Sequence, residues 1–161
     1  MAIQSEVHKA GVVVEFGPGS GSITREVVAR KTNDAIFFAI EMNPRMCEVF
    51  RHRFPEVEIF EDSAENVKAL LQQKGVEKAN SIVSSLPWAA FPSELQDKLL
   101  GAAFDVLEPG GIFTSFAYLQ GMLLPAGQRF QKRLESLFPQ VSKSRIVWRN
   151  LPPAFVYRCV K

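Results

Sequence analysis

Three glycines at a spacing of two follow a run of valines and an acid near the start of the chain. Residues 12–24 read VVVEFGPGSGSIT. Glycine has no Cβ, so alternate glycines let the backbone turn tightly and lie flat against a ligand. The segment therefore predicts a strand that ends in a ligand-binding turn. We assign the following residues to this site: Glu15, Gly17, Pro18, Gly19 and Gly21.

The spacing and the acid together indicate the kind of ligand. A dinucleotide fingerprint places its third glycine three residues after the second, where this chain has Ser22. Glu15 would also repel a pyrophosphate bound at the start of the following helix. A cationic, amine-bearing ligand suits the loop better than a dinucleotide.

Composition limits the classes of protein to which the chain can belong. Its 161 residues are enough for one domain, residues 1–161, with a short polar lead over residues 1–10. It has no apolar run of the ~20 residues that a membrane span needs and no signal peptide, so we expect a cytoplasmic protein. The net charge of +2 is too small to indicate nucleic acid by itself. The two histidines and two cysteines are isolated, so we expect no metal site.

Alternating apolar segments predict the elements that hold the glycine turn. Strands are expected over residues 11–16, 35–40, 57–60, 81–84 and 111–118. Helices are expected between them: from residue 23 to the polar break at 31–34, from Pro44, through residues 67–71, and over 94–107 and 128–138. Strands that alternate with helices predict an α/β fold with a parallel, doubly wound sheet.

The end of the chain has a different pattern. Two further strands are expected over residues 142–148 and 155–160. The connection between them is too short for a crossover helix, so these two strands should be antiparallel.

The acid, any residue, then Gly-x-Gly-x-Gly pattern resembles motif I of the class I S-adenosylmethionine-dependent methyltransferases. The ligand of those enzymes carries a sulfonium and an α-amino group, and their sheet also ends in an antiparallel hairpin. The resemblance implies a Rossmann-like, mostly parallel seven-stranded sheet in the order 3-2-1-4-5-7-6 with an antiparallel last strand. It also implies S-adenosylmethionine as the cofactor.

Acids at the ends of the second and third strands extend this site, because ligands of such sheets bind at the carboxyl ends of the strands. Glu41 stands where a carboxylate accepts hydrogen bonds from ribose hydroxyls, and Asp62 stands where one accepts from an adenine amino group. Single acids in solvated loops are the alternative. The remaining cofactor-binding residues are expected to be Met42, Ser63, Ala64 and Ser84.

The fourth strand ends in Ser84-Ser85-Leu86-Pro87-Trp88. Amino-methylating members of the class carry an Asn-Leu-Pro-aromatic or Asn/Asp-Pro-Pro-aromatic motif here, whose oxygens accept hydrogen bonds from the target amine while the aromatic ring contacts it. Ser85 departs from that pattern, and its shorter side chain disfavours a planar adenine target. The resemblance implies these catalytic residues: Ser85, Leu86, Trp88 and Tyr118. Packing of a loop is the alternative role for Trp88.

Three segments together resemble the bacterial phospholipid N-methyltransferases, which methylate phosphatidylethanolamine. They are the Ser-Ser-Leu-Pro segment, Phe116-Ala117-Tyr118, and residues 149–154 between the last strands. The resemblance implies a phospholipid headgroup at a membrane surface as the partner, and peripheral membrane association. Tyr118 and Arg149 are expected to contact the lipid phosphate. Residues 118–125 are largely apolar and either meet acyl chains or cover the core edge.

Two other functions remain open. The rRNA adenine dimethyltransferases are similar to this group, so a nucleic-acid adenine methyltransferase is the first alternative, although those enzymes carry Asn in place of Ser85. The second is a cofactor-binding module without its own activity. The family usually has a helical segment before the first strand, whereas only ten residues precede that strand here. No histidine is placed to act as the base, so Tyr118, Ser85 through water, or desolvation of the amine are the options.

Overall fold

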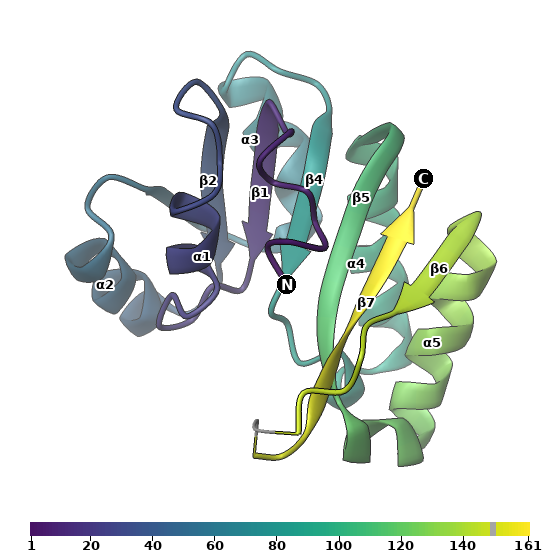
Figure 1. The fold of residues 1–161 in the computed structure, drawn as a ribbon. Coiled ribbons are helices and arrows are strands. Elements are labelled where there is room, and N and C mark those ends of the chain that lie inside the picture. The colour runs from purple at the N-terminus through teal and green to yellow at the C-terminus, as the bar shows by residue number, and fades with distance from the viewer. Residues whose placement is uncertain (149–150) are drawn as a thin grey trace.

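Strands and helices alternate along most of the chain in the computed structural model, which describes residues 1–148 and 151–161 (Figure 1). The strands are β1 (Val12–Phe16), β2 (Ile36–Glu41), β3 (Glu58–Glu61), β4 (Ala79–Ser84), β5 (Leu107–Tyr118), β6 (Gln140–Lys143) and β7 (Ala154–Val160). The α-helices are α1 (Thr24–Val28), α2 (Pro44–Arg53), α3 (Val67–Gln73), α4 (Ser93–Val106) and α5 (Pro125–Leu137). Three 3₁₀-helices are η1 (Ala64–Asn66), η2 (Trp88–Ala90) and η3 (Leu119–Leu123).

The strands form one seven-stranded sheet in the order β3-β2-β1-β4-β5-β7-β6. The first five strands are parallel, and β7 is antiparallel to both β5 and β6. The predicted fold class and strand order are confirmed. The carboxyl ends of the parallel strands meet at one edge of the sheet, which is the lower edge in Figure 1.

Helices cover both faces of the sheet, which explains why its central strands are apolar on both sides. In β2, Phe38 and Ile40 pack toward α3 and α4, whereas Ala39 packs toward α2 on the opposite face. The helices α3, α4 and α5 lie behind the sheet in Figure 1, and α1 and α2 lie in front of it. The largest cluster of buried side chains fills the space between the sheet and the three rear helices.

The lead, residues 1–10, packs against the sheet although half of its side chains are polar. Ala2, Val7 and Ala10 of the lead are buried against Val13 of β1 and Val83 of β4, whereas Ile3 is exposed. Arg158 of β7 donates to the carbonyl of Gln4 at 3.0 Å and to the carboxylate of Glu6 at 2.9 Å. Residues buried from the lead are Ala2, Ser5, Val7 and Ala10. The lead therefore serves as a covering layer on the front face of the sheet.

The sixth strand is shorter than predicted and lies earlier, because residues 142–148 do not continue as one ladder. Beyond β6, the hydroxyl of Ser144 accepts the Val156 N–H at 2.9 Å, so a side chain replaces the backbone carbonyl that a strand would supply. The Ser144 N–H still donates to the Val156 carbonyl at 2.9 Å, and the described chain next pairs with β7 at an isolated bridge between Val147 and Ala154. The ladder is therefore interrupted at Ser144.

Other boundaries differ by a few residues. Pro125 occupies the first turn of α5 and begins that helix before the predicted residue 128, since its fixed φ suits a helix start. β5 begins at Leu107 and includes the turn that was expected to precede it. None of the helices in the described ranges is long and apolar enough to cross a membrane.

Candidate active site

The glycine turn after β1 has positive φ at all three glycines, which side chains other than glycine rarely adopt. A Cβ at Gly21 would lie 2.1 Å from a ring carbon of Phe54, and one at Gly17 would lie 2.6 Å from Leu86. A Cβ at Gly19 would meet no atom within 4 Å. Packing against the Phe54 ring therefore requires glycine at position 21, a Cβ at Gly17 would displace the end of the Leu86 side chain, and Gly19 borders open space.

That space is a cavity of about 510 Å³ at the carboxyl edge, within the ~300–1,000 Å³ range of small-molecule sites. We call it the glycine-loop cavity. It is lined by Met1, Gly17, Pro18, Gly19, Ser22, Ile23, Ser85, Phe116, Tyr118, Val147, Ala154, Phe155 and Val156. Because the loop leaves room at Gly19 that the protein itself does not use, the cavity fits a bound cofactor.

Glu41 ends β2 beside this turn. One of its carboxylate oxygens accepts the N–H of Gly19 at 3.3 Å, and the other accepts the N–H of Asn43 at 2.9 Å. Two backbone donors thus fix the carboxylate next to the glycine turn, and each oxygen keeps a second lone pair for a ligand hydroxyl. This placement suits the predicted ribose contact.

Asp62 follows β3 and is held in a similar way. Its Oδ1 accepts the N–H of Ser63 and the side-chain amide of Asn66, each at 2.7 Å. The Ser63 hydroxyl accepts from the N–H of Glu65 and caps η1. Of the other residues predicted here, Ala64 is buried and Met42 is exposed.

Replacing Glu41 with alanine is expected to weaken S-adenosylmethionine binding by about 1.5–3 kcal/mol, roughly ten- to a hundred-fold in Kd. The loss follows because the variant removes a charge-assisted acceptor. Calorimetric titration measures the change, and Glu56→Ala, an exposed acid before β3, is the matched control. Thermal unfolding of both variants separates a loss of fold from a loss of ligand contact. An unchanged Kd for Glu41→Ala would remove this residue from the site.

Glu15 lies beneath the glycine turn and is fully buried. Its Oε2 accepts the hydroxyl of Thr24 at 2.7 Å and so joins β1 to α1. Its Oε1 has no hydrogen-bond partner among the described residues. Burial raises the pKa of Glu15 to about 7, although the hydrogen bond from Thr24 acts in the opposite direction. Glu15 is not among the residues that line the glycine-loop cavity.

A second cavity of about 470 Å³ adjoins the first, and we call it the acceptor cavity. It is lined by Ser85, Leu86, Pro87, Trp88, Ala89, Ala90, Phe116, Ala117, Tyr118, Gln120, Gly121, Met122, Leu124, Gly127, Phe130 and Tyr157. None of these side chains carries a charge at neutral pH, and most are apolar. Such a lining suits an apolar ligand group better than a charged one.

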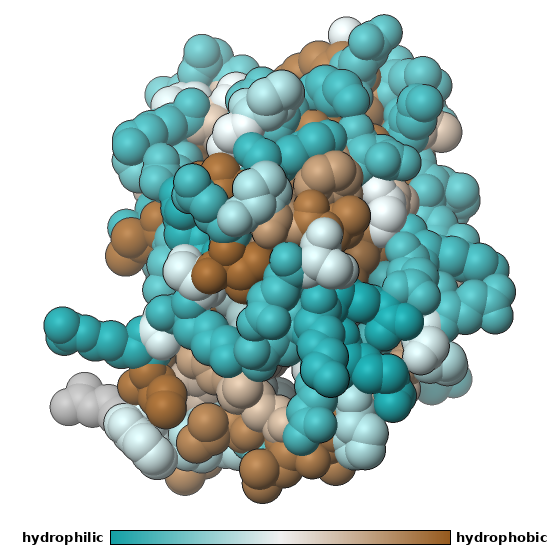
Figure 2. All heavy atoms as spheres, turned by 90° about the vertical axis from the view of Figure 1, so that its right-hand side faces the viewer, coloured by the Kyte–Doolittle hydropathy of each residue, from teal (hydrophilic) through white to brown (hydrophobic). Residues whose placement is uncertain are grey.

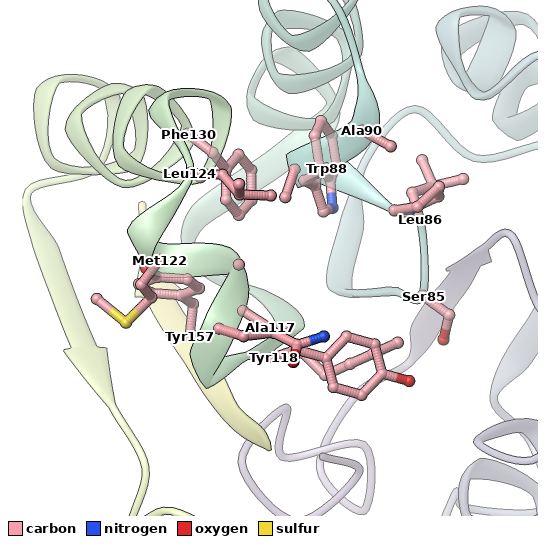
Figure 3. Close-up of a pocket in the computed structure, with 16 residues that line it drawn as sticks. Ser85, Leu86, Trp88, Ala90, Ala117, Tyr118, Met122, Leu124, Phe130 and Tyr157 are labelled. Carbon is pink, nitrogen blue, oxygen red and sulfur yellow. The ribbon is translucent and has the colours of Figure 1, made fainter. Parts of the chain in front are cut away.

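Ser85, Phe116 and Tyr118 line both cavities, so the two cavities meet at these residues. The Ser85 Oγ is buried and has no hydrogen-bond partner in the described part of the chain. Figure 3 shows the Ser85 and Tyr118 hydroxyls at one end of the acceptor cavity, while Met122 and Tyr157 line the other end. The sequence predicted both hydroxyls as catalytic, and the structure brings them together.

Trp88 forms the wall of the acceptor cavity and is itself only 3% exposed. Its ring stacks on Phe130 with centroids 4.7 Å apart, and its indole N–H donates to the Ser84 hydroxyl at 3.0 Å. The Ser84 hydroxyl, expected in the cofactor site, is therefore used to hold Trp88. Leu86 lies between the two sites, because it lines the acceptor cavity and packs close to Gly17.

Sequence reasoning missed the contribution of β7. This strand is antiparallel, so its first residues, 154–156, lie at the edge where the parallel strands end, and they line the glycine-loop cavity. The predicted hairpin was the signal that would have found them. Arg149, predicted to contact substrate, lies outside the described residues. In the ranges that the structure describes, no group of His, Cys, Asp or Glu is arranged to hold a metal ion.

Comparison with known families identifies the chemistry for which this arrangement is used. The pattern of the methyltransferase domain family matches residues 13–111, from β1 into β5. The chain belongs to the methyltransferase domain family. This confirms the predicted enzyme class, a methyltransferase that uses S-adenosylmethionine.

Relatives of this methyltransferase act on different substrates. An ornithine lipid N-methyltransferase of Singulisphaera acidiphila is 34% identical over 93% of this chain and 76% of its own length. A probable ribosomal RNA small subunit methyltransferase A of Pyrococcus furiosus is 26% identical over 90% of this chain. This methyltransferase spans about half of that second relative, 49% of its length.

A solved structure shows the same fold. The O-methyltransferase of Bacillus cereus in complex with SAH superposes with a TM-score of 0.77, covering 99% of this methyltransferase and 78% of that chain. The two sequences are 14% identical, so the likeness concerns the fold alone.

Proposed function

We propose that this methyltransferase methylates the amine of a membrane lipid headgroup. The observation that carries the proposal is the acceptor cavity, whose lining is uncharged and largely apolar and which meets the glycine-loop cavity at Ser85 and Tyr118. A soluble polar substrate would gain little from such a lining, whereas a lipid has apolar groups to place against it.

We place the cofactor at the carboxyl edge of the sheet. S-adenosylmethionine supplies a methyl group on a sulfonium when it is bound. Gly19 leaves room for a ligand, Glu41 presents a fixed acceptor to ribose hydroxyls, and Asp62 presents one to the adenine amino group. Glu15 supports the turn from beneath through Thr24.

Ser85 and Tyr118 hold the target amine at the junction of the cavities. The buried Ser85 Oγ accepts a hydrogen bond from the amine, which gives this orphaned atom a partner. A free ammonium of this kind has a pKa near ~10, and an apolar cavity lowers it because burial disfavours the charged form. Desolvation thus favours the neutral amine, whose proton passes to solvent as the headgroup enters the cavity, and the two hydroxyls orient its lone pair.

One relative supports a lipid amine. The relative with 34% identity is named for N-methylation of ornithine lipid, and the sequence motifs resemble enzymes that methylate phosphatidylethanolamine. The proposal covers what these substrates share, a primary amine on a lipid headgroup. Arg149 and Tyr118 remain the proposed contacts to the acidic group of that lipid.

The direct test is methyl transfer from labelled S-adenosylmethionine to vesicles that contain phosphatidylethanolamine or ornithine lipid, with ribosomal RNA offered in parallel. We expect label in the lipid amine. Ser85→Ala should lower kcat/KM about ten-fold or more, because one hydrogen bond to the amine is lost. Ser93→Ala, an exposed serine at the start of α4, is the matched control. Label found only in RNA, or in no lipid while the cofactor binds, would contradict the proposal.

A further inference from the structure

Two connections at the carboxyl edge of the sheet carry large apolar side chains that are exposed. One connection joins β5 to α5 and the other joins β6 to β7, and both lie at the lower end of the molecule in Figure 1. Leu123 is 80% exposed and Leu151 is 90% exposed. We call the following residues the apolar rim: Tyr118, Leu123, Leu124, Val147, Trp148 and Leu151. Figure 2 shows apolar side chains gathered along this lower end, below a band of polar ones.

The apolar rim is continuous with the two cavities. Tyr118 and Leu124 line the acceptor cavity, and Val147 lines the glycine-loop cavity. Exposed apolar patches that border a ligand site mark surfaces that meet a partner. A ligand that enters the acceptor cavity past Leu124 therefore crosses an apolar surface.

Charge is distributed unevenly along the chain, and the rim lies in its basic part. Residues 109–161 contain eight Lys or Arg and one acid, a formal charge of +7. Residues 1–108 contain eleven Lys or Arg and sixteen acids, a formal charge of −5. Arg129 comes a few residues after Leu124 of the rim, and Arg145 comes a few residues before Val147. Both arginines are exposed. Within the described ranges, neither forms a salt bridge.

We propose that the apolar rim inserts into the headgroup region of an anionic phospholipid bilayer, with the acceptor cavity open toward the membrane. The inference rests on the proposed function, because a lipid substrate gives that cavity its apolar occupant. Apolar side chains in a positively charged part of the chain match a bilayer whose headgroups are negative and whose interior is apolar. A second copy of this chain would bring the same positive charge to the contact.

Vesicle flotation tests the docking surface independently of catalysis. The full chain is mixed with vesicles of phosphatidylethanolamine plus phosphatidylglycerol, or of phosphatidylethanolamine plus phosphatidylcholine. We expect binding to the anionic vesicles that weakens with salt. Leu123→Glu and Leu151→Glu should each lower the partition coefficient about ten-fold or more, because a charge replaces an inserted side chain. Val49→Glu, at an exposed apolar position on α2, is the control and should bind normally.

The fluorescence of Trp148 provides a second readout. Trp148 is 67% exposed, whereas Trp88 is buried, so the emission of Trp148 should shift to shorter wavelength when vesicles are added. Trp148→Phe should abolish the shift. Equal binding by wild type and both glutamate variants, or an unshifted emission, would overturn the docking surface. A concentration-dependent dimer that both glutamate variants disrupt would assign the rim to self-association instead.

A short-chain, water-soluble amino lipid separates failure of this inference from failure of the proposed function. Leu123 and Leu151 line neither cavity, so their glutamate variants should methylate the soluble lipid at the wild-type rate and lose activity on vesicles. Methylation of vesicles by both variants at the wild-type rate would contradict the docking surface and leave the proposed function standing. If neither substrate is methylated while vesicles still bind through the rim, the proposed function fails and the docking surface stands.

Discussion

Replacing Trp88 with alanine should destabilise the fold by about 4 kcal/mol, because a buried aromatic side chain would leave a cavity that the neighbouring rings cannot fill. The ring is stacked on Phe130 and makes edge contacts with Phe91 and Phe113, each with centroids 6.0 Å away. The variant also leaves the Ser84 hydroxyl without the indole donor. Urea unfolding followed by circular dichroism measures the loss.

Trp88→Phe is the matched comparison. It keeps a ring against Phe130 and removes only the larger indole and its N–H, so we expect a loss of about 1–2 kcal/mol. The sequence resemblance assigned the Trp88 ring to contact with the target amine. If Trp88→Ala lost under about 1 kcal/mol of stability and yet abolished methyl transfer, contact with the amine would be the main role of this ring. A large loss of stability with Trp88→Ala, largely restored in Trp88→Phe, would assign the ring to the core.

Replacing Glu15 with glutamine should make the protein more stable than wild type at neutral pH, by up to about 3 kcal/mol. The pKa of Glu15 in the folded protein is about 7, above the value of 4.5 for a free glutamate. The folded state therefore holds this proton more tightly than the unfolded state does. The contribution of Glu15 to stability is complete below about pH 4.5 and is lost as the pH rises through about 7.

The measurement is denaturant unfolding of Glu15→Gln and wild type at several pH values between 4.5 and 8. The stability difference between them should grow with pH, and the effects of other carboxyls cancel because both proteins share them. Thr24→Val should raise the pKa of Glu15 further, because it removes the hydrogen bond that stabilises the carboxylate. A difference between Glu15→Gln and wild type that stays constant over this range would mean that Glu15 is ionised normally in the folded protein.

Most of the sheet could be predicted because its central strands are covered on both faces. The apolar run over residues 35–40 became β2 with a shift of one residue, since helices on both sides require apolar side chains at every position. β6 could not be predicted in the same way. Residues 146–148 have the composition of a strand, but the Ser144 side chain takes the Val156 N–H in place of a backbone carbonyl, and the ladder is interrupted before them.

The placement of the candidate site residues was predictable where it follows from topology. Glu41 and the glycine turn lie at strand ends, and the order of the strands brings those ends together. The direction of buried side chains was harder to predict. Glu15 shares a face of β1 with Val13, and the sequence did not show that this face is covered, because half of the residues in the lead that packs there are polar.

The position of β7 between β5 and β6 determines when the sheet can be completed as the chain is synthesised. β6 pairs with β7 alone among the described strands, so it leaves the ribosome before the strand that it must join. The hydrogen bond from Arg158 to the Gln4 carbonyl of the lead also forms late, because Arg158 comes 154 residues after Gln4. Until β7 emerges, β5 is an open edge with an apolar surface, which is the arrangement that pairs with other chains. We therefore expect a nascent chain halted before residue 154 to aggregate more readily than the complete chain.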